Sequence, residues 1–312
     1  MWQFVEEPER RFGNVVGTPE SLTNAHKGRG RCIKNSADSR VAMFRYLLVA
    51  SIEDPVARAV WEYWNPRDLT GLHVAGNPIY QLSPAAAAVQ RPGHHVADDT
   101  LDSCLPCPVL SNKIPIVFPS IHQSEQQIPC FTVHPLGNTG NEADVGGRPA
   151  SLVPAPARLM VNALRQLAEA KDTTGLPATY EATHHGPWLR NPAFFAEIGF
   201  DLTKGPPTEA VEVLARTLLT LNENSEDRVV VGVGGGHYVP HFTDLALRRQ
   251  WAFGHLISRH ALETLDSTVA RQAIDQTPAC EGVLFARAED SRSPMWQGVG
   301  ARLRDQDAPR RG

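Results

Sequence analysis

The chain of 312 residues lacks the features that mark several large classes of protein. Its net charge is only −4, so composition alone guarantees no strongly basic, nucleic-acid-binding face. No apolar run approaches the roughly 20 residues needed to cross a bilayer. The five cysteines are an odd, scattered set, which argues against a disulfide framework and favours the cytoplasm. With 42% apolar and 21% charged residues, the composition is that of a soluble globular protein.

The common short motifs of metal and nucleotide sites are also missing. Cys104 and Cys107 form a C-x-x-C pair, but no second pair completes a tetrahedral zinc site. The glycine run at 234–236 is not a dinucleotide-binding loop, because His237 occupies the position of the third glycine. No Lys-Ser/Thr follows it, so it is not a Walker loop, and no H-E-x-x-H, G-x-S-x-G or EF-hand sequence occurs.

Large aliphatic residues are sparse before residue 43, and the pattern divides the chain into three parts. Residues 1–42 are expected to form a disordered N-terminal extension, 43–290 the functional domain, and 291–312 a weakly structured C-terminal segment. Within the domain, the Pro- and Ala-rich residues 83–112 are expected to be a long connection inserted at the surface.

Strand-like and helix-like segments alternate along the domain. Strands are predicted at 44–50, 114–118, 130–134, 178–183, 194–200, 228–233 and 282–286. Helices are predicted from 55 to about 64, at 157–170 and at 207–221. This alternation predicts an α/β fold with a mixed, largely parallel sheet flanked by helices.

Two histidine-bearing turns follow strands of this predicted sheet. The first is Tyr180–Pro187 (YEATHHGP), and the second is Val233–Tyr238 (VGGGHY). In open α/β sheets, ligands bind beyond the carboxyl ends of the strands. We therefore expect His184 and His237 to converge in one polar pocket that holds a metal ion or a phosphate-bearing substrate, with His122 and His134 as further members.

Each candidate also has an ordinary structural explanation. An isolated His73 or His260 is more often a surface or packing residue. His122 and His134 can be turn residues at strand ends as readily as ligands. Adjacent histidines on an extended chain point in opposite directions, so only one of His184 and His185 is expected to reach a given ligand.

Two neighbouring features add chemistry to the turns. Glu181 can orient an imidazole or act as a general base, although it can also be a solvated carboxylate. Three successive residues without Cβ, Gly234, Gly235 and Gly236, let the backbone approach a ligand and offer N–H groups to a phosphate or an oxyanion. A flexible turn is the alternative.

Together, the two turns resemble the signature motifs of the archaeal and plant type of D-aminoacyl-tRNA deacylase. Further segments resemble the same family from about Phe44 to Phe285. These segments are 76–80 (GNPIY), 121–124 (IHQS), 132–138 (TVHPLGN), 194–199 (FFAEIG) and 252–255 (AFGH). The sequence departs from the family pattern at His241, where a basic residue is more usual.

The resemblance implies a zinc-dependent hydrolase that cleaves the ester between a D-amino acid and the terminal ribose of tRNA, a reaction of translation quality control. It also implies a fold that is partly similar to phosphorylase/hydrolase proteins. The implied catalytic residues are Glu181, His184, His185 and His237. The implied metal ligands are His122, His134, His184 and His237. Substrate binding falls to Gly137, Asn138, Gly234, Gly235, Gly236 and Tyr238.

Two other functions remain open at this level. One is a metal-dependent hydrolase or phosphorylase that acts on a small nucleoside or amide, and the other is a non-catalytic metal- or RNA-binding module. The partner implied by the resemblance is the acceptor end of tRNA carrying a D-amino acid, with no membrane and no obligate protein partner. A local basic patch would have to bind it, with candidates Arg158, Arg165, Arg190, Arg248 and Arg249.

Overall fold

The computed structural model describes residues 44–124, 127–287, 289–292 and 296. The predicted extension 1–42 and nearly all of the predicted C-terminal segment 291–312 lie outside the described residues. Within the described residues, no helix is both long and apolar enough to cross a membrane.

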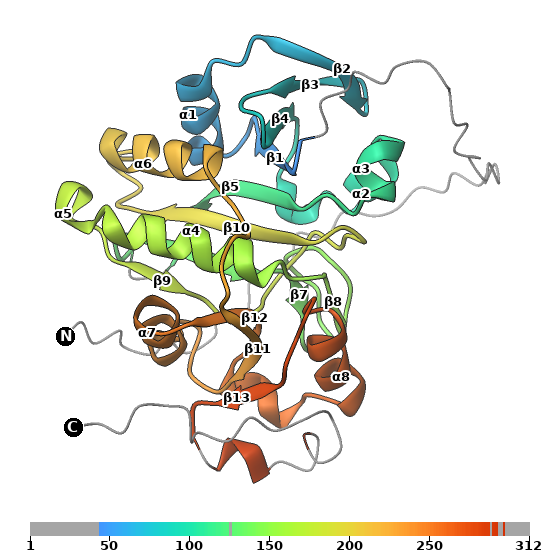
Figure 1. Cartoon of the computed structure of the whole chain (residues 1–312), viewed down its shortest axis with the longest axis vertical. Coiled ribbons are helices and arrows are strands. Elements are labelled where there is room, and N and C mark those ends of the chain that lie inside the picture. Colours follow the sequence, from blue (N-terminus) through green and yellow to red (C-terminus); the bar gives the residue numbers. More distant parts are fainter. Residues whose placement is uncertain (1–43, 125–126, 288, 293–295, 297–312) are drawn as a thin grey trace. The chain divides into compact units, whose positions relative to one another are not determined.

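A mixed eight-stranded sheet forms the larger part of the fold (Figure 1). Its strand order is β2-β3-β4-β1-β5-β10-β6-β9. Four of these strands, β4, β1, β5 and β10, are parallel to one another, whereas β10 is antiparallel to β6. The strands are β1 (Tyr46–Ser51), β2 (Asp68–Val74), β3 (Asn77–Gln81), β4 (Ala86–Arg91), β5 (Ile116–His122), β6 (Cys130–Pro135), β9 (Ala178–Tyr180) and β10 (Ala193–Gly199). The predicted fold class is confirmed.

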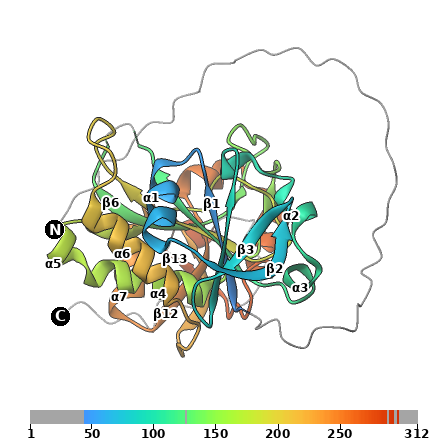
Figure 2. The same cartoon turned by 90° about the horizontal axis from the view of Figure 1, so that it is seen from above.

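Three amphipathic helices, α1 (Pro55–Trp64), α4 (Ala157–Glu169) and α6 (Thr208–Leu219), lie together on one face of this sheet (Figure 2). Asp54 caps the first helix by accepting a hydrogen bond from the Ala57 N–H at 2.8 Å, as its position before a helical Pro predicts. Trp64 Nε1 donates to the Ala215 carbonyl at 3.0 Å and ties α1 to α6. The apolar stripe of α4 that the sequence predicted is buried, from Leu159 to Leu167.

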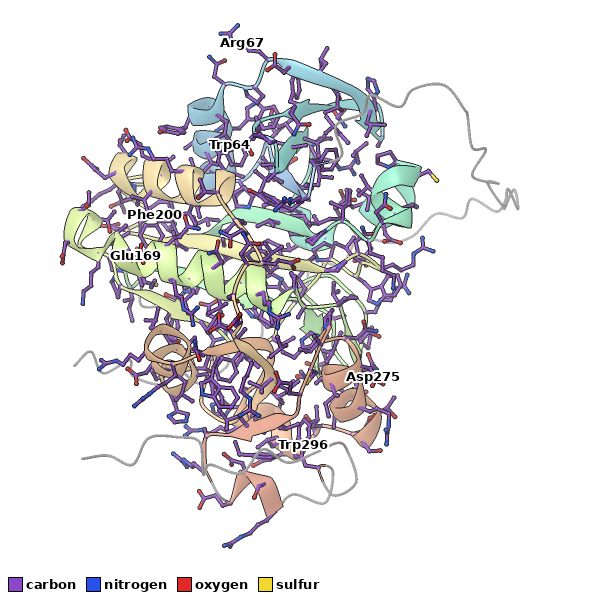
Figure 3. The ribbon with its side chains drawn as sticks, in the orientation of Figure 1. Trp64, Arg67, Glu169, Phe200, Asp275 and Trp296 are labelled. Atoms are coloured by element: carbon purple, nitrogen blue, oxygen red, sulfur yellow. The ribbon has the colours of Figure 1, made fainter. Side chains whose placement is uncertain are left out.

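A separate three-stranded parallel sheet has the order β12-β11-β13, with α7 and α8 on either side of it (Figure 1). Its strands are β11 (Arg228–Val233), β12 (Trp251–Ile257) and β13 (Val283–Phe285), and its helices are α7 (Pro240–Arg248) and α8 (Ser267–Asp275). Trp296 is buried in the same cluster against Phe285, with ring centroids 6.0 Å apart (Figure 3). The predicted strand 228–233 is confirmed at both ends, whereas β12 was not predicted.

The expectation that residues 83–112 form a surface insertion is wrong for its first part. β4 pairs in parallel with β1 over six residues and is buried at Ala86, Ala87, Ala88 and Val89. The three alanines of β4 have weak strand propensity, so pairing with β1 is what makes this segment a strand. The rest of the segment forms short helices on the other face of the sheet, where His95 packs on Phe118 and Phe195.

The remaining elements are short and connect these layers. They are η1 (His95–Ala97), α2 (Leu101–Cys104), α3 (Cys107–Ser111), β7 (Gly137–Asn138), β8 (Ser151–Leu152), α5 (Lys171–Thr174), η2 (Arg259–Glu263) and η3 (Asp290–Arg292). β7 and β8 pair to hold the ends of the 139–150 loop together. This loop and the 184–191 loop lie against each other, because Gly186 N donates to Val145 O.

Candidate metal centre and active site

The histidines gather on a face of the large sheet, in a row that runs across its strands. β10 is parallel to β5 but antiparallel to β6. The carboxyl ends of β5 and β6 therefore point toward opposite ends of the sheet's strands. His122 and His134 join one cluster as expected, because Glu197 contacts both, but the expectation that neighbouring strand ends bring them together is wrong. The register aligns His122 with Gly199 and His134 with Phe195, and side chains two residues apart on a strand share a face. Glu197 lies between the two histidines on that face.

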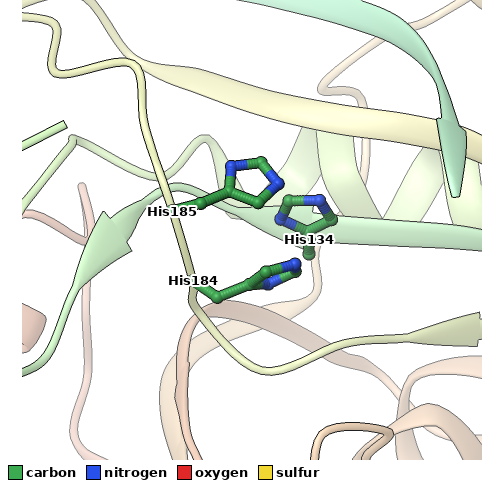
Figure 4. A group of neighbouring side chains, drawn as sticks. All are labelled: His134, His184 and His185. Carbon is green, nitrogen blue, oxygen red and sulfur yellow. The ribbon is translucent and has the colours of Figure 1, made fainter. Parts of the chain in front are cut away.

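His134, His184 and His185 form a group of three imidazoles whose ligand atoms all lie within 4.8 Å of one another (Figure 4). In each ring, Nδ1 lies close to a backbone carbonyl oxygen: 3.2 Å from Pro135 O for His134, 2.8 Å from Ala182 O for His184, and 2.7 Å from Gly186 O for His185. A carbonyl only accepts hydrogen bonds, so Nδ1 carries the proton and Nε2 keeps its lone pair. Three fixed Nε2 lone pairs on one side are what a zinc ion requires.

The electrostatics keep two members of this trio, His184 and His185, neutral. Burial, with the neighbouring imidazoles of His134 and His185, holds the pKa of His184 well below its ordinary value. Burial and His134 lower the pKa of His185 to about 4. His134 Nε2 is a buried nitrogen without a hydrogen bond. His184 and His185 therefore offer unprotonated nitrogens at neutral pH, and with His134 beside them the residues present fit a metal ion.

The backbone at His185 explains why two adjacent histidines serve one group. We expected them to point in opposite directions, as on an extended strand, and this is wrong. His185 has φ +42°, in the left-handed region, so its ring turns back and lies 4.4 Å from that of His184. A non-glycine residue in this conformation costs on the order of 1–3 kcal/mol, which is typical of functional sites.

The three-stranded sheet holds the loop that carries His184 and His185. Thr183 N donates to Leu256 O at 2.7 Å, and Leu256 N donates back to Thr183 Oγ1 at 3.0 Å. His255 Nδ1 lies 3.1 Å from the same hydroxyl, and burial lowers the pKa of this histidine to about 3. At the other side, Gly137 N donates to His185 O. The three-stranded sheet and the β7–β8 pair thus position this loop.

His122 lies in a different environment, between carboxylates. Its Nδ1 is 3.0 Å from Glu181 Oε1 and 3.4 Å from Glu197 Oε2, and its Nε2 is 2.7 Å from Tyr238 Oη. Burial alone would lower the pKa of His122, but the two carboxylates outweigh it and hold this pKa well above its ordinary value. His122 is therefore an imidazolium, and both of its nitrogens are engaged.

Glu181 connects the two halves of the histidine cluster. It is fully buried, and its oxygens lie 3.9 Å from His184 Nε2 and 3.6 Å from His237 Nε2. Burial would raise its pKa, but His122 and His237 hold it well below the usual value for a glutamate, so it is a carboxylate. None of its contacts has the alignment of a hydrogen bond. It could also serve a metal ion together with His184 and His237.

The predicted convergence of His184 and His237 is confirmed, because their ring centroids lie 4.8 Å apart. The His237 side chain is 48% exposed, and it reaches the cluster from the glycine turn after β11. Burial opposes protonation of His237, but Glu181 outweighs it and raises the pKa of this histidine. His237 is thus the member of the cluster that faces both solvent and the buried carboxylate.

The glycines and Asn138 have clear structural tasks. A Cβ at Gly234 (φ +112°) would lie 2.6 Å from Asp290 Oδ2, and a Cβ at Gly137 (φ +141°) would lie 2.7 Å from Leu152 Cα. Asn138 Nδ2 donates to Gly146 O at 2.9 Å and braces the loop beside His185. The carboxylate of Asp290 against Gly234 disfavours a phosphate at that point of the glycine turn.

Comparison with known proteins shows the family of this chain. The family model described as D-aminoacyl-tRNA deacylase matches residues 112–297. The D-aminoacyl-tRNA deacylase of Thermoplasma volcanium is 34% identical over 187 residues, which cover 60% of this chain and 69% of that protein. The enzyme of that name from Thermococcus kodakarensis is 36% identical over 206 residues, covering 65% and 74% of the two chains. The chain belongs to the D-aminoacyl-tRNA deacylase family.

A crystal structure of a conserved protein of unknown function has a similar fold, with a TM-score of 0.70 and 27% identity. The alignment covers 82% of this deacylase and 90% of that chain. The expected partial likeness of the deacylase fold to phosphorylase/hydrolase proteins stays a prediction.

Most of the arginines predicted to form a basic patch are held by ion pairs or hydrogen bonds within the protein. Arg165 makes a bidentate ion pair with the buried Asp227 at 2.7 and 2.9 Å, and Arg158 donates to the Asp227 carbonyl. Arg190 pairs with Asp102, and Arg248 pairs with Asp244. Most of these arginines therefore have structural or local partners. The backbone carbonyl of Arg249 accepts a hydrogen bond from Arg165.

Sequence reasoning missed Glu197, which lies between His122 and His134 in the candidate site. Its carboxylate lies 3.5 Å from His134 Nε2 and 3.4 Å from His122 Nδ1, and Thr132 Oγ1 donates to it at 3.3 Å. Burial opposes ionisation, but the hydrogen bond from His122, together with the nearby His134, lowers the pKa of Glu197 to about 2. The signal was present, because a glutamate inside the aromatic strand 194–199 cannot be buried without a partner.

Proposed function

We propose that this chain hydrolyses the ester that joins a D-amino acid to the terminal ribose of tRNA, with a zinc ion held by His134, His184 and His185. The products are the free D-amino acid and tRNA, and the reaction serves translation quality control. Membership of the D-aminoacyl-tRNA deacylase family supports the reaction. Three Nε2 lone pairs, each fixed by a backbone carbonyl, support the metal centre.

In this proposal, His185 replaces His122 among the expected ligands, and His237, also expected to bind the metal, acts in proton transfer instead. His122 has both nitrogens engaged and holds a proton between two carboxylates, so it would have to lose that proton to bind a metal. His185 has a free Nε2 and a low pKa. When bound, zinc supplies Lewis-acid chemistry, because it makes a water molecule more acidic and polarises an ester carbonyl.

His237 and Glu181 act as the acid–base pair in this proposal. His237 is half exposed, so an incoming substrate and water can reach it, and Glu181 lies 3.6 Å behind its Nε2. The imidazole accepts a proton from the attacking water and returns it to the ribose oxygen that leaves. Glu181 stabilises the imidazolium that forms in between. This arrangement follows the logic of a base that is oriented by a buried carboxylate.

His122 and Tyr238 complete the wall of the site. The phenol Oη accepts a hydrogen bond from the His122 imidazolium, so its own O–H group is directed away from that ring. Glu197 neutralises His122 on the other side and lies beside His134. These residues hold the geometry of Glu181 and of the trio.

A comparison of D-tyrosyl-tRNA and L-tyrosyl-tRNA tests the function. We expect release of D-tyrosine to exceed release of L-tyrosine by far, and a chelator to abolish it until zinc is added back. Equal deacylation of both substrates, or of neither, would contradict the proposed reaction. Release that is insensitive to the chelator would contradict the metal centre but not the substrate.

The same experiment separates the two alternatives. A hydrolase or phosphorylase of small nucleosides would act on free nucleosides and leave both aminoacyl-tRNAs intact. A non-catalytic module would bind zinc without turning over either substrate. Action in the cytoplasm stays a prediction.

A further inference from the structure

An exposed arginine lies on a tryptophan at the rim of the histidine trio. The Arg148 guanidinium carbon is 3.5 Å from the centre of the Trp188 ring. Trp188 is partly buried, and Arg148 is exposed. Neither residue takes part in the proposed reaction.

The position of this pair follows from its neighbours in the chain. Trp188 is three residues after His185, so its Cα lies at most about 11 Å from that of His185. Arg148 follows Gly147, whose backbone packs on Gly186: a Cβ at Gly186 would lie 2.7 Å from Gly147 Cα. Both residues therefore lie close to the loop that carries His184 and His185.

The pair is held rigidly from both sides. Asp99 Oδ1 accepts a hydrogen bond from the backbone N–H of Trp188 at 2.9 Å. Asn138 Nδ2 donates to the Arg148 carbonyl at 3.3 Å and to the Gly146 carbonyl. Such bracing lowers the ordering cost of binding, because the surface already has its bound shape.

The charge of Arg148 is not neutralised within the described residues, where no carboxylate oxygen lies within 4.0 Å of its guanidinium. Arg190, at the same rim, differs: its Nε is 2.6 Å from Asp102 Oδ2. The loop of Arg148 also carries exposed Glu142 and Asp144, so attraction for an anion is confined to the guanidinium itself. Stacking must then supply much of the binding.

We propose that Arg148 and Trp188 form a stacking platform for the single-stranded 3′ end of tRNA, and this proposal rests on the proposed function. One nucleobase stacks on the guanidinium plane, and an N–H group of Arg148 donates to an adjacent phosphate. Planar guanidinium groups and aromatic rings are the usual partners of unpaired bases. The platform orients the terminal ribose ester toward the trio.

Steady-state deacylation of D-tyrosyl-tRNA by three variants tests the platform. Arg148→Ala and Trp188→Ala are expected to raise KM roughly tenfold, with kcat and zinc content close to those of the unchanged protein. Arg148→Lys keeps the charge but loses the plane, so it should also raise KM. Arg67→Ala is the matched control, because Arg67 is exposed before β2, at the far edge of the sheet order (Figure 3).

Binding of a short RNA that ends in CCA gives an independent readout. Stacking on the platform should quench tryptophan fluorescence, and Trp188→Phe should remove the quenching. An unchanged KM in Arg148→Ala, with normal turnover by the starting protein, would overturn the platform and leave the proposed function intact. An Arg148→Lys variant that behaves like the starting protein would show a charge contact and overturn the stacking. Absence of turnover in the starting protein, by contrast, would contradict the proposed function. In that case, fluorescence quenching by the CCA-ending RNA that disappears in Trp188→Phe would still support the platform, and quenching that persists in this variant would contradict it.

Discussion

The histidine trio and the carboxylate-bound histidines are neighbours, yet they are tuned in opposite directions. In His134, His184 and His185, Nδ1 lies against a backbone carbonyl oxygen, which leaves Nε2 as the nitrogen that can bind a metal ion. In His122, Nδ1 meets two carboxylates, and the ring becomes a cation. The partner of one ring nitrogen therefore decides whether a histidine can bind a metal or can only balance charge.

Exposure separates the two regions as well. His122, Glu181 and Glu197 are almost fully buried, so their charges must be compensated by neighbouring groups of the protein. His237 is half exposed and shares Glu181 with His122. Glu181 therefore couples a structural ion pair to the residue that faces the substrate.

Removal of one trio member is the strongest way to break this comparison. His184→Ala should lose bound zinc and lower turnover by about 10³-fold, since a Lewis-acid ion contributes several kcal/mol to the transition state. Metal analysis and single-turnover deacylation measure both effects. His260→Ala, at an exposed position of η2, should change neither. If His122→Ala lost its zinc while His185→Ala retained it, the division into a trio and a charge-balancing histidine would be wrong.

Removal of the imidazolium should show mainly as a loss of stability. His122→Ala leaves the buried carboxylates of Glu181 and Glu197 uncompensated, which should lower the free energy of unfolding by about 3–5 kcal/mol at neutral pH. Denaturant unfolding measures this change. Addition of Glu197→Gln should recover part of the loss, because one buried charge disappears. A loss in His122→Ala no larger than that in His260→Ala would show that the cation does not balance these carboxylates.

The buried histidine His255 should have a smaller effect, on the pH dependence of stability. His255 is buried and neutral, with a pKa of about 3. The unfolded chain binds a proton at this residue below its ordinary pKa of 6.5, and the folded chain does not, so His255 lowers stability as pH falls from about 6.5 to 3. Between pH 7 and pH 5, the unchanged protein should lose about 2 kcal/mol more of its free energy of unfolding than His255→Asn.

Denaturant unfolding of both proteins at the two pH values measures the difference. The other histidines titrate in both proteins, so their contributions cancel in the comparison. If stability depended equally on pH in both proteins, His255 would bind a proton as readily in the folded chain as in the unfolded chain, which would contradict the prediction.

Local patterns predicted much of the fold. The valine-rich strand 228–233, the capped helix that begins at Pro55 and the amphipathic helix from Ala157 all formed as expected, because each is specified by the periodicity and end signals of its own residues. β4 was missed because its alanines gain a strand conformation only by pairing with β1. β12 was missed although it is wholly buried.

The sequence by itself determined which chemistry is available: histidines after strands, a glutamate three residues before a histidine pair, and a glycine turn that ends in His237. Only the tertiary structure decided how these groups are divided. The antiparallel β6–β10 pairing aligned Glu197 with the histidines, and the left-handed turn at His185 brought a third Nε2 into the trio. The reason is physical: a residue's type is local, whereas the partner of each ring nitrogen depends on segments that are distant in the chain.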